Sequence, residues 1–144
     1  MRKPYSFSIL RYVHDPVTQE FVNIGVAVYS GEAGFLRAIC TAHCTRINGM
    51  FERIDDNRFR QLTTYVQEKI GEIGANLPST LPFEPMLAIE QLLARVLPPD
   101  DSSVRFSRGG VGLAHDLDKT MAELFERYVN RYASTADSTD RISH

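Results

Sequence analysis

FSILRYV (residues 7–13) and FVNIGVAVY (residues 21–29) are the two stretches of this chain that decide its fold. Both are rich in the β-branched and aromatic residues that favour strands. Asp15 and Pro16 between them are typical of a turn, because proline disfavours helix in the residue before it. The second stretch is apolar at nearly every position, which is typical of a strand buried on both faces. We therefore predict a β-hairpin in which Gly25 marks a bulge or the close approach of another group.

We predict two further strands, one directly after the hairpin and one near residue 104. Residues 30–34 (SGEAG) have turn composition, and residues 35–40 (FLRAIC) have strand composition. Three strands joined by short turns predict an antiparallel meander. We expect a short fourth strand at residues 104–107.

Three later segments have apolar side chains at helical spacing. Asp55 and Asp56 precede the first and Asp116 precedes the third, and a carboxylate at such a position caps a helix N-terminus. Pro98 and Pro99 are expected to end the second helix, because proline supplies no N–H. The apolar stripes are Phe59, Leu62, Val66, Ile70 and Ile73; Met86, Ile89, Leu92, Leu93 and Val96; and Leu117, Met121, Leu124, Phe125, Tyr128, Val129 and Tyr132.

The elements together predict an α+β fold. We expect an antiparallel sheet of three to four strands packed against about three helices, with the helices on one face of the sheet. The length of 144 residues is that of one domain. We expect a single domain over residues 1–133 and a flexible tail over residues 134–144, which are rich in Ser, Thr and Asp. Residues 41–54 are compatible with helix or loop.

Composition and charge exclude several classes of protein. A formal net charge of −2 argues against a strongly basic nucleic-acid-binding protein. No window holds the roughly 20 apolar residues that cross a bilayer, and the N-terminus lacks the apolar run of a signal peptide. We therefore expect a cytoplasmic protein that does not enter a membrane and needs no cofactor.

The segments YSFSILRY (residues 5–12), DPV (15–17) and EFVNIGV (20–26) also suggest a family. Together with VRF (104–106) and LFERYV (124–129), they resemble the bacterial domain of unknown function 3037 family. The resemblance covers residues 5–131. The family has no assigned activity, so the resemblance implies no catalytic residues. Because some members are encoded beside a HipA-like protein kinase, it implies such a kinase as a partner.

Polar residues inside the hairpin are candidate binding residues. Pairing across the turn places Arg11 near Glu20 or Phe21. Asn23 stands in an otherwise apolar strand, and a buried amide needs partners for its donors and its acceptor. Two interpretations stay open for Asn23: it bonds the backbone and locks the bulge at Gly25, or it faces a ligand.

Two further segments have a functional and a structural interpretation. RGGVG (residues 108–112) is expected to be a flexible loop, although its glycines could let main-chain N–H groups approach a phosphate. Arginines 46, 53, 58 and 60 are interleaved with Phe51 and Phe59, a pattern that can hold single-stranded nucleic acid. Neighbouring acids nearly balance these charges, so the same pattern is typical of a solvated helix face with two core phenylalanines.

Cys40, His43 and Cys44 have the residue types of a metal site but provide at most three ligands. Structural zinc needs four. We therefore predict no metal site and interpret Cys40 as a buried thiol at a strand end. The two cysteines do not make the disulfide framework of a secreted protein.

The sequence contains no recognisable set of catalytic residues. Our preferred hypothesis is a non-catalytic protein-binding module, which presents a sheet edge or a helix face to a partner such as the HipA-like kinase. The alternative is a small nucleotide- or nucleic-acid-processing enzyme or binding factor. Its site would lie around Arg11, Asn23 and Arg46.

Overall fold

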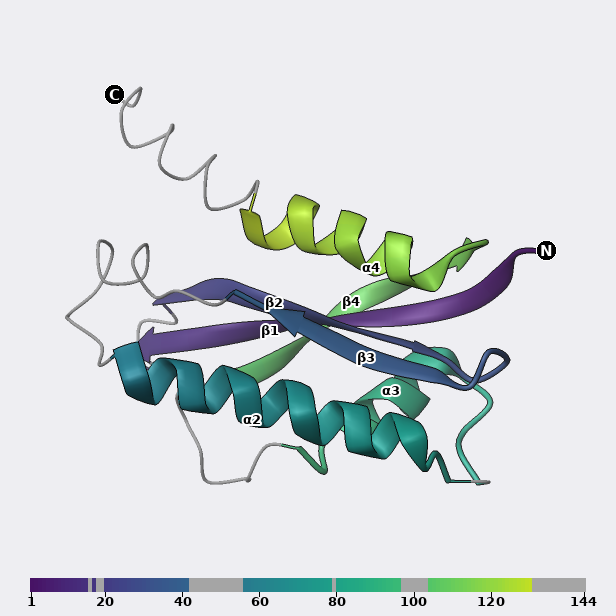
Figure 1. The fold of residues 1–144 in the computed structure, drawn as a ribbon, viewed down its shortest axis with the longest axis horizontal. Helices are drawn as coiled ribbons and strands as arrows, with labels where there is room; N and C mark the ends of the chain where they lie inside the picture. Colours follow the sequence, from purple (N-terminus) through teal and green to yellow (C-terminus); the bar gives the residue numbers. More distant parts are fainter. Residues whose placement is uncertain (16, 18–19, 42–55, 79, 97–103, 131–144) are drawn as a thin grey trace.

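One antiparallel sheet of four strands forms the centre of the molecule (Figure 1). The computed structural model describes residues 1–15, 17, 20–41, 56–78, 80–96 and 104–130. The order of the strands in the sheet is β3-β2-β1-β4, so the predicted meander is confirmed and a fourth strand joins β1. The strands are β1 (Lys3–Asp15), β2 (Glu20–Ser30), β3 (Phe35–Cys40) and β4 (Val104–Ala114).

Three helices and a π-helical turn lie where the apolar stripes predict them. They are α2 (Asp56–Ala75), α3 (Pro85–Leu93), α4 (Leu117–Phe125) and the turn η1 (Glu126–Asn130), which continues α4. The Asp116 carboxylate accepts a hydrogen bond from the Lys119 main-chain N–H at 3.1 Å, which confirms it as a cap. Glu84 caps α3 in the same way, accepting from Met86 and Leu87. The side chains of Asp55 and Asp56 lie outside the described part of the chain.

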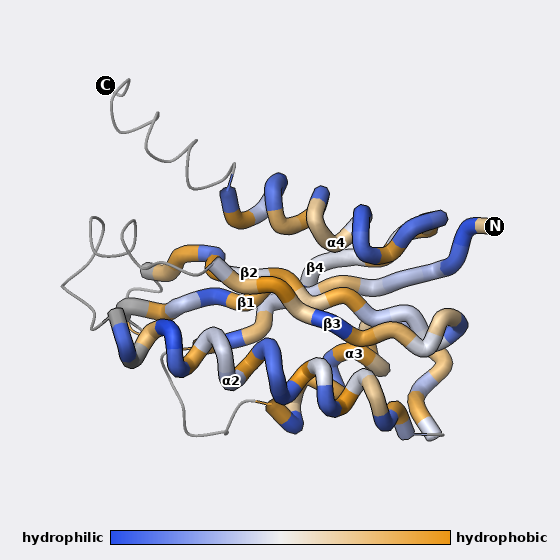
Figure 2. Tube along the Cα trace, viewed as in Figure 1, coloured by the Kyte–Doolittle hydropathy of each residue, from blue (hydrophilic) through white to orange (hydrophobic). Residues whose placement is uncertain are grey.

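The helices cover both faces of the sheet, so the prediction that they lie on one face is wrong. Helices α2 and α3 lie on one side and α4 on the other (Figure 1). Along β2, Val26 and Val28 pack into the core under α4, whereas Ala27 and Tyr29 pack into the core over α2 and α3. Figure 2 shows β2 as hydrophobic along most of its length. A strand that is apolar at successive positions exposes one apolar set on each face, and each set needs its own cover.

The glycine-rich stretch at residues 108–112 is part of β4, so the prediction of a flexible loop there is wrong. The glycines are needed because two rings of β1 lie across this strand. A Cβ on Gly109 would collide with the Phe7 ring, and a Cβ on Gly112 would come within 2.7 Å of the Tyr5 Oη. Glycine here makes room for aromatic side chains, which also excludes a phosphate-wrapping loop.

Gly25 lies at a bulge and at a close approach, as predicted. The pairing of β1 with β2 passes from Leu10 opposite Gly25 to Arg11 opposite Asn23, so Ile24 is the extra residue. A Cβ on Gly25 would lie 2.8 Å from the Ile39 carbonyl oxygen of β3. The tight contact requires a residue without a side chain at position 25.

Several predictions fall outside the described residues. They concern the flexible tail at residues 134–144 and, apart from Thr41, the segment 41–54. Among the helices that the structure describes, none has the length and hydropathy needed to span a membrane.

Candidate functional site

Two of the three predicted binding residues contact each other. Arg11 and Asn23 are register partners on β1 and β2, and the Arg11 Nε donates a hydrogen bond to the Asn23 Oδ1 at 3.4 Å. The Arg11 guanidinium carbon lies 4.1 Å from the centroid of the Phe21 ring, so the expected proximity of Arg11 to Phe21 is confirmed. An aromatic face and an amide oxygen therefore hold the guanidinium in one place.

Asn23 joins the sheet to the helix layer. Its side chain is buried, with a relative exposure of 6%. The Asn23 Nδ2 donates to the main-chain carbonyl of Tyr128 in η1 at 2.9 Å. Of the two interpretations that the sequence left open, this contact agrees with bonding to the backbone, although the carbonyl belongs to η1 rather than to the bulge at Gly25. The same amide thereby fixes the Arg11 side chain.

Arg105 on β4 is the register partner of Arg11 on its other side. The neighbours Leu10 and Phe106 point toward α2 and α3. Because side chains alternate along a strand, Arg11 and Arg105 both point to the face that α4 covers. Two positive side chains thus lie opposite each other on adjacent strands. Arg105 lies in a strand, as predicted, but local sequence contains no signal that pairs it with Arg11.

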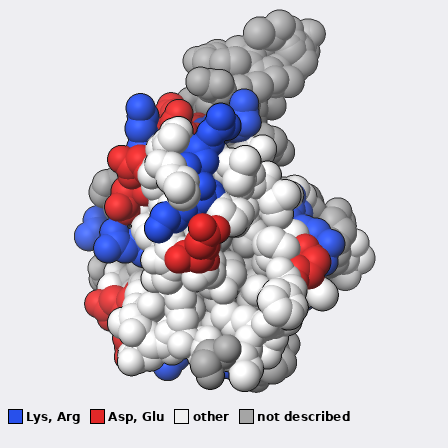
Figure 3. Space-filling model, turned by 90° about the vertical axis from the view of Figure 1, so that its right-hand side faces the viewer, with Lys and Arg blue, Asp and Glu red and all other residues white. Residues whose placement is uncertain are grey.

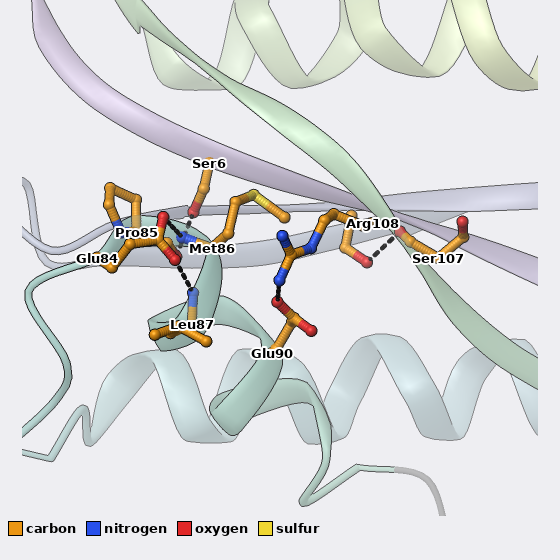
Figure 4. Close-up of polar contacts among 9 residues, drawn as sticks. Ser6, Glu84, Pro85, Met86, Leu87, Glu90, Ser107 and Arg108 are labelled. Carbon is orange, nitrogen blue, oxygen red and sulfur yellow. Dashed lines mark hydrogen bonds and ion pairs between the residues drawn. The ribbon is translucent and has the colours of Figure 1, made fainter.

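β4 forms one edge of the sheet and is exposed along much of its length. Val111 and Leu113 are 61% and 60% exposed and lie on the same face of the strand. On that face the Arg108 guanidinium forms an ion pair with Glu90 of α3 (Figure 4). Ser6, the register partner of Val111, donates from its hydroxyl to the Pro85 carbonyl at 3.2 Å. These contacts fix the start of α3 beside the exposed half of β4.

A largely uncharged surface lies near the start of α3, although the capping residue Glu84 is itself charged and exposed. Figure 3 views the end of the molecule that holds the N-terminus, and uncharged side chains fill much of the lower half of that view. A pocket of about 500 Å³ lies in this region, with Tyr5, Pro82 and Phe83 among its lining residues. Phe83 itself is fully exposed, at 106%. We call Tyr5, Pro82 and Phe83 the end surface.

The chain was compared with models of known protein families, and one of them matches. Residues 7–129 match the family described as "Protein of unknown function (DUF3037)". The chain belongs to the DUF3037 family. Neither the curated proteins nor the solved structures include a match to it. The family match over residues 7–129 confirms the resemblance that was inferred from the hairpin segments. The DUF3037 match includes Arg11, Asn23, Arg105 and all of β4, but it assigns them no role.

The third predicted binding residue of this DUF3037 protein, Arg46, lies outside the described residues. So do Arg53, Phe51 and the side chain of Arg58, three further members of the proposed basic set, whereas Arg60 is described and exposed on α2. Phe59 is 2% exposed and belongs to the core over α2, as the structural interpretation of that segment expects. The alternative interpretation of this segment as a nucleic-acid-binding face is not tested by the described residues.

Cys40 is a buried thiol at the end of β3, as predicted for this DUF3037 chain. Burial raises the pKa of the thiol from 9.0 to about 12. His43 and Cys44 lie outside the described residues. Within the described ranges no three His, Cys, Asp or Glu side chains come close enough to hold a metal ion.

Three residues that form the exposed edge or the arginine pair of this DUF3037 fold were not predicted from the sequence. Val111 and Leu113 were assigned to a glycine-rich loop, because glycine is a turn signal. The available signal was their spacing of two residues, which places both on one face of a strand. The third residue, Arg105, needed the register of β4 on β1, which no local pattern contains.

Proposed function

We propose that this DUF3037 protein is a non-catalytic binding module for another protein, and that the outer edge of β4 receives the partner. The supporting observation is that β4 is an edge strand of 11 residues with two exposed aliphatic side chains, Val111 and Leu113. The main-chain N–H and C=O groups on the outer side of an edge strand are a template for another strand. Exposed aliphatic side chains add contacts to the alternate side chains of that strand.

The composition of β4 supports this choice of edge. Proteins usually protect a sheet edge with lysine, proline or another charge. Residues 109–114 (GGVGLA) contain none of these. The nearest charge is Arg108, and its guanidinium is held by Glu90. The opposite edge strand β3 is shorter, at 6 residues, and carries Arg37. β4 is therefore the better acceptor for an added strand.

The family resemblance supports a HipA-like protein kinase as the partner. Such a kinase would place an extended segment beside β4, and apolar side chains of that segment would contact Val111 and Leu113. The end surface lies beside this edge, because Ser6 joins the register position of Val111 to the start of α3. It would extend the contact area beyond the strand itself. Exposed apolar patches of this kind mark sites of protein association.

The experiment measures binding of the HipA-like kinase from the same genome to the full chain and to a V111K/L113K variant. Lysine on an edge strand opposes strand addition and removes the aliphatic contacts. We expect the affinity to fall about tenfold or more, a change of about 1.4 kcal/mol in binding free energy. The control is Tyr65→Lys, which places one such lysine at a residue of α2 that is 49% exposed.

Two results would contradict the proposal at different levels. If the kinase binds the V111K/L113K variant as tightly as the unchanged chain, β4 is not the binding edge. If the tagged chain recovers no stoichiometric protein from its native host, including the kinase, the protein-binding function itself is wrong.

A further inference from the structure

We propose that Arg11 and Arg105 form a binding site for a phosphate group on the face of the sheet that α4 covers. The two residues are register partners on β1 and β4 and point to the same face. This inference is independent of the protein-binding function, because that function uses the outer edge and the opposite face of β4. The proposed site adds Arg105 to Arg11 and Asn23, which are two of the three binding residues predicted from the sequence.

The pairing of two arginines needs an explanation. Like charges directly opposite each other on adjacent strands are destabilising. The other two arginines on described strands do not have this problem, because Arg37 pairs with Asp118 at 2.9 Å and Arg108 pairs with Glu90. Among the side chains that the structure describes, no carboxylate contacts the guanidinium of Arg11 or of Arg105. Within the described part of the chain the pair therefore breaks a stability rule, and proteins break such rules mainly at functional sites.

Arg11 is held in the way that an anion-binding arginine requires. The Phe21 ring lies against its guanidinium, and Asn23 accepts from its Nε. Asn23 is in turn fixed by its bond to the Tyr128 carbonyl. A guanidinium that is held at its face and at its Nε can present its two terminal nitrogens together to an oxyanion. Its rotamer entropy is already lost before the ligand arrives, so the ligand binds a prepared group.

Phosphate is the ligand class that fits the charge of this site. Two guanidinium groups carry a charge of +2, and a phosphate group carries close to −2 above a pH of about 6 and has three strong acceptor oxygens. A carboxylate has one charge and would neutralise only one arginine. Free phosphate and a phosphate monoester share the same chemistry, so the probes are inorganic phosphate and adenosine monophosphate.

The experiment titrates the full chain with each probe at about pH 7.5, where phosphate is mostly dianionic. Chloride keeps the ionic strength equal, because general screening also reduces repulsion between arginines. Amide and arginine Nε–H resonances report binding, and thermal unfolding reports stability. The variants are Arg105→Gln, which removes half of the proposed site, and the control Arg37→Gln, which removes an exposed arginine from the other edge strand.

We expect phosphate to shift the Arg11 Nε–H resonance and to raise the unfolding midpoint. Arg105→Gln should weaken phosphate binding about tenfold or more. Without phosphate, the same variant should be at least as stable as the unchanged chain, because the repulsion is gone. Arg37→Gln should leave the phosphate affinity within about twofold. Tighter binding of adenosine monophosphate would assign the site to a monoester, and equal binding would assign it to the phosphate group alone.

A merely structural arginine pair predicts a different pattern. If Arg105→Gln leaves phosphate binding unchanged, or if chloride at equal ionic strength produces the same shifts, the site does not exist. If Arg105→Gln lowers the unfolding midpoint in the absence of phosphate, Arg105 is a structural residue and the proposal is overturned.

Discussion

The Asn23 side chain on β2 donates to the main-chain carbonyl of Tyr128, 105 residues later in the chain, across 2.9 Å. This hydrogen bond joins the central strand to the turn η1 that ends the α4 layer. The carbonyl it satisfies lies at a π-helical turn, where the regular helical hydrogen-bond pattern is altered. One polar side chain in an apolar strand thus connects two layers and also fixes Arg11.

Replacing Asn23 with alanine should destabilise the protein. The change leaves the Tyr128 carbonyl without this donor in a partly buried position, and it releases the Arg11 Nε. We expect the free energy of unfolding, measured with urea, to fall by about 1–3 kcal/mol. The matched control is Asn76→Ala, because the Asn76 amide also donates to a carbonyl but is exposed. It should change stability by less than about 0.5 kcal/mol. Equal losses in both variants would contradict the structural role of Asn23.

Two glycine-to-alanine changes should have opposite signs. At Gly109 an added Cβ meets the ring and the main-chain oxygen of Phe7, and the main chain cannot move away easily. We expect Gly109→Ala to lower the free energy of unfolding by about 1–3 kcal/mol. At Gly71 in α2 nothing lies within 4 Å of the new Cβ, so Gly71→Ala should raise it by about 0.5–1 kcal/mol. Urea denaturation of the two variants tests this, and a stable Gly109→Ala protein would show that the Phe7 ring does not lie across β4.

The parts of the fold that depend on local pattern could be predicted from the sequence. Helices α2, α3 and α4 follow from the 3.6-residue spacing of apolar side chains, and the hairpin follows from two strand-like runs around Pro16. The layer arrangement also had its signal in β2, where Val26, Ala27 and Val28 are apolar in succession. That pattern predicts a strand buried on both faces. A strand buried on both faces needs helices on both sides of the sheet, so the pattern already argued against helices on one side alone.

The parts that depend on pairing between distant segments could not be predicted. The glycines of β4 are explained by Tyr5 and Phe7, which lie about 100 residues earlier in the chain. A turn and a strand under aromatic rings have the same local composition, so residues 108–112 were assigned to the wrong one. The opposition of Arg11 and Arg105 is likewise a property of the register, which the sequence does not display.

The cap of α4 provides a third test. The Asp116 carboxylate accepts from the Lys119 N–H at 3.1 Å and satisfies one donor of the first turn. Asp116→Ala should lower the free energy of unfolding by about 1 kcal/mol, because that donor loses its partner. Asp116→Asn is the matched control and should retain most of the stability, since asparagine caps almost as well. If thermal unfolding ranks the two variants equally, the cap does not stabilise α4.

The buried thiol of Cys40 should make the free energy of unfolding depend on pH in the alkaline range. Burial raises the pKa of its thiol to about 12, whereas the unfolded chain has a value near 9.0. A group with a raised pKa in the folded state stabilises fully below the unfolded pKa, and this contribution is lost as the pH rises through the folded pKa. The free energy of unfolding should therefore fall between these two values. Burial raises the pKa of Tyr29 as well, so that residue contributes in the same direction.

The variant Cys40→Ala separates the two contributions. It retains Tyr29 but has no thiol to ionise, so its free energy of unfolding should fall less than that of the unchanged chain between about pH 8 and about pH 10.5. The change in free energy of unfolding between the two pH values is taken for each protein separately. The loss of stability caused by the smaller alanine side chain is the same at both pH values and therefore cancels. Urea denaturation at the two pH values measures it. Parallel pH profiles would mean that the Cys40 thiol ionises equally in the folded and unfolded chain, which a thiol buried between β3 and α2 would not do.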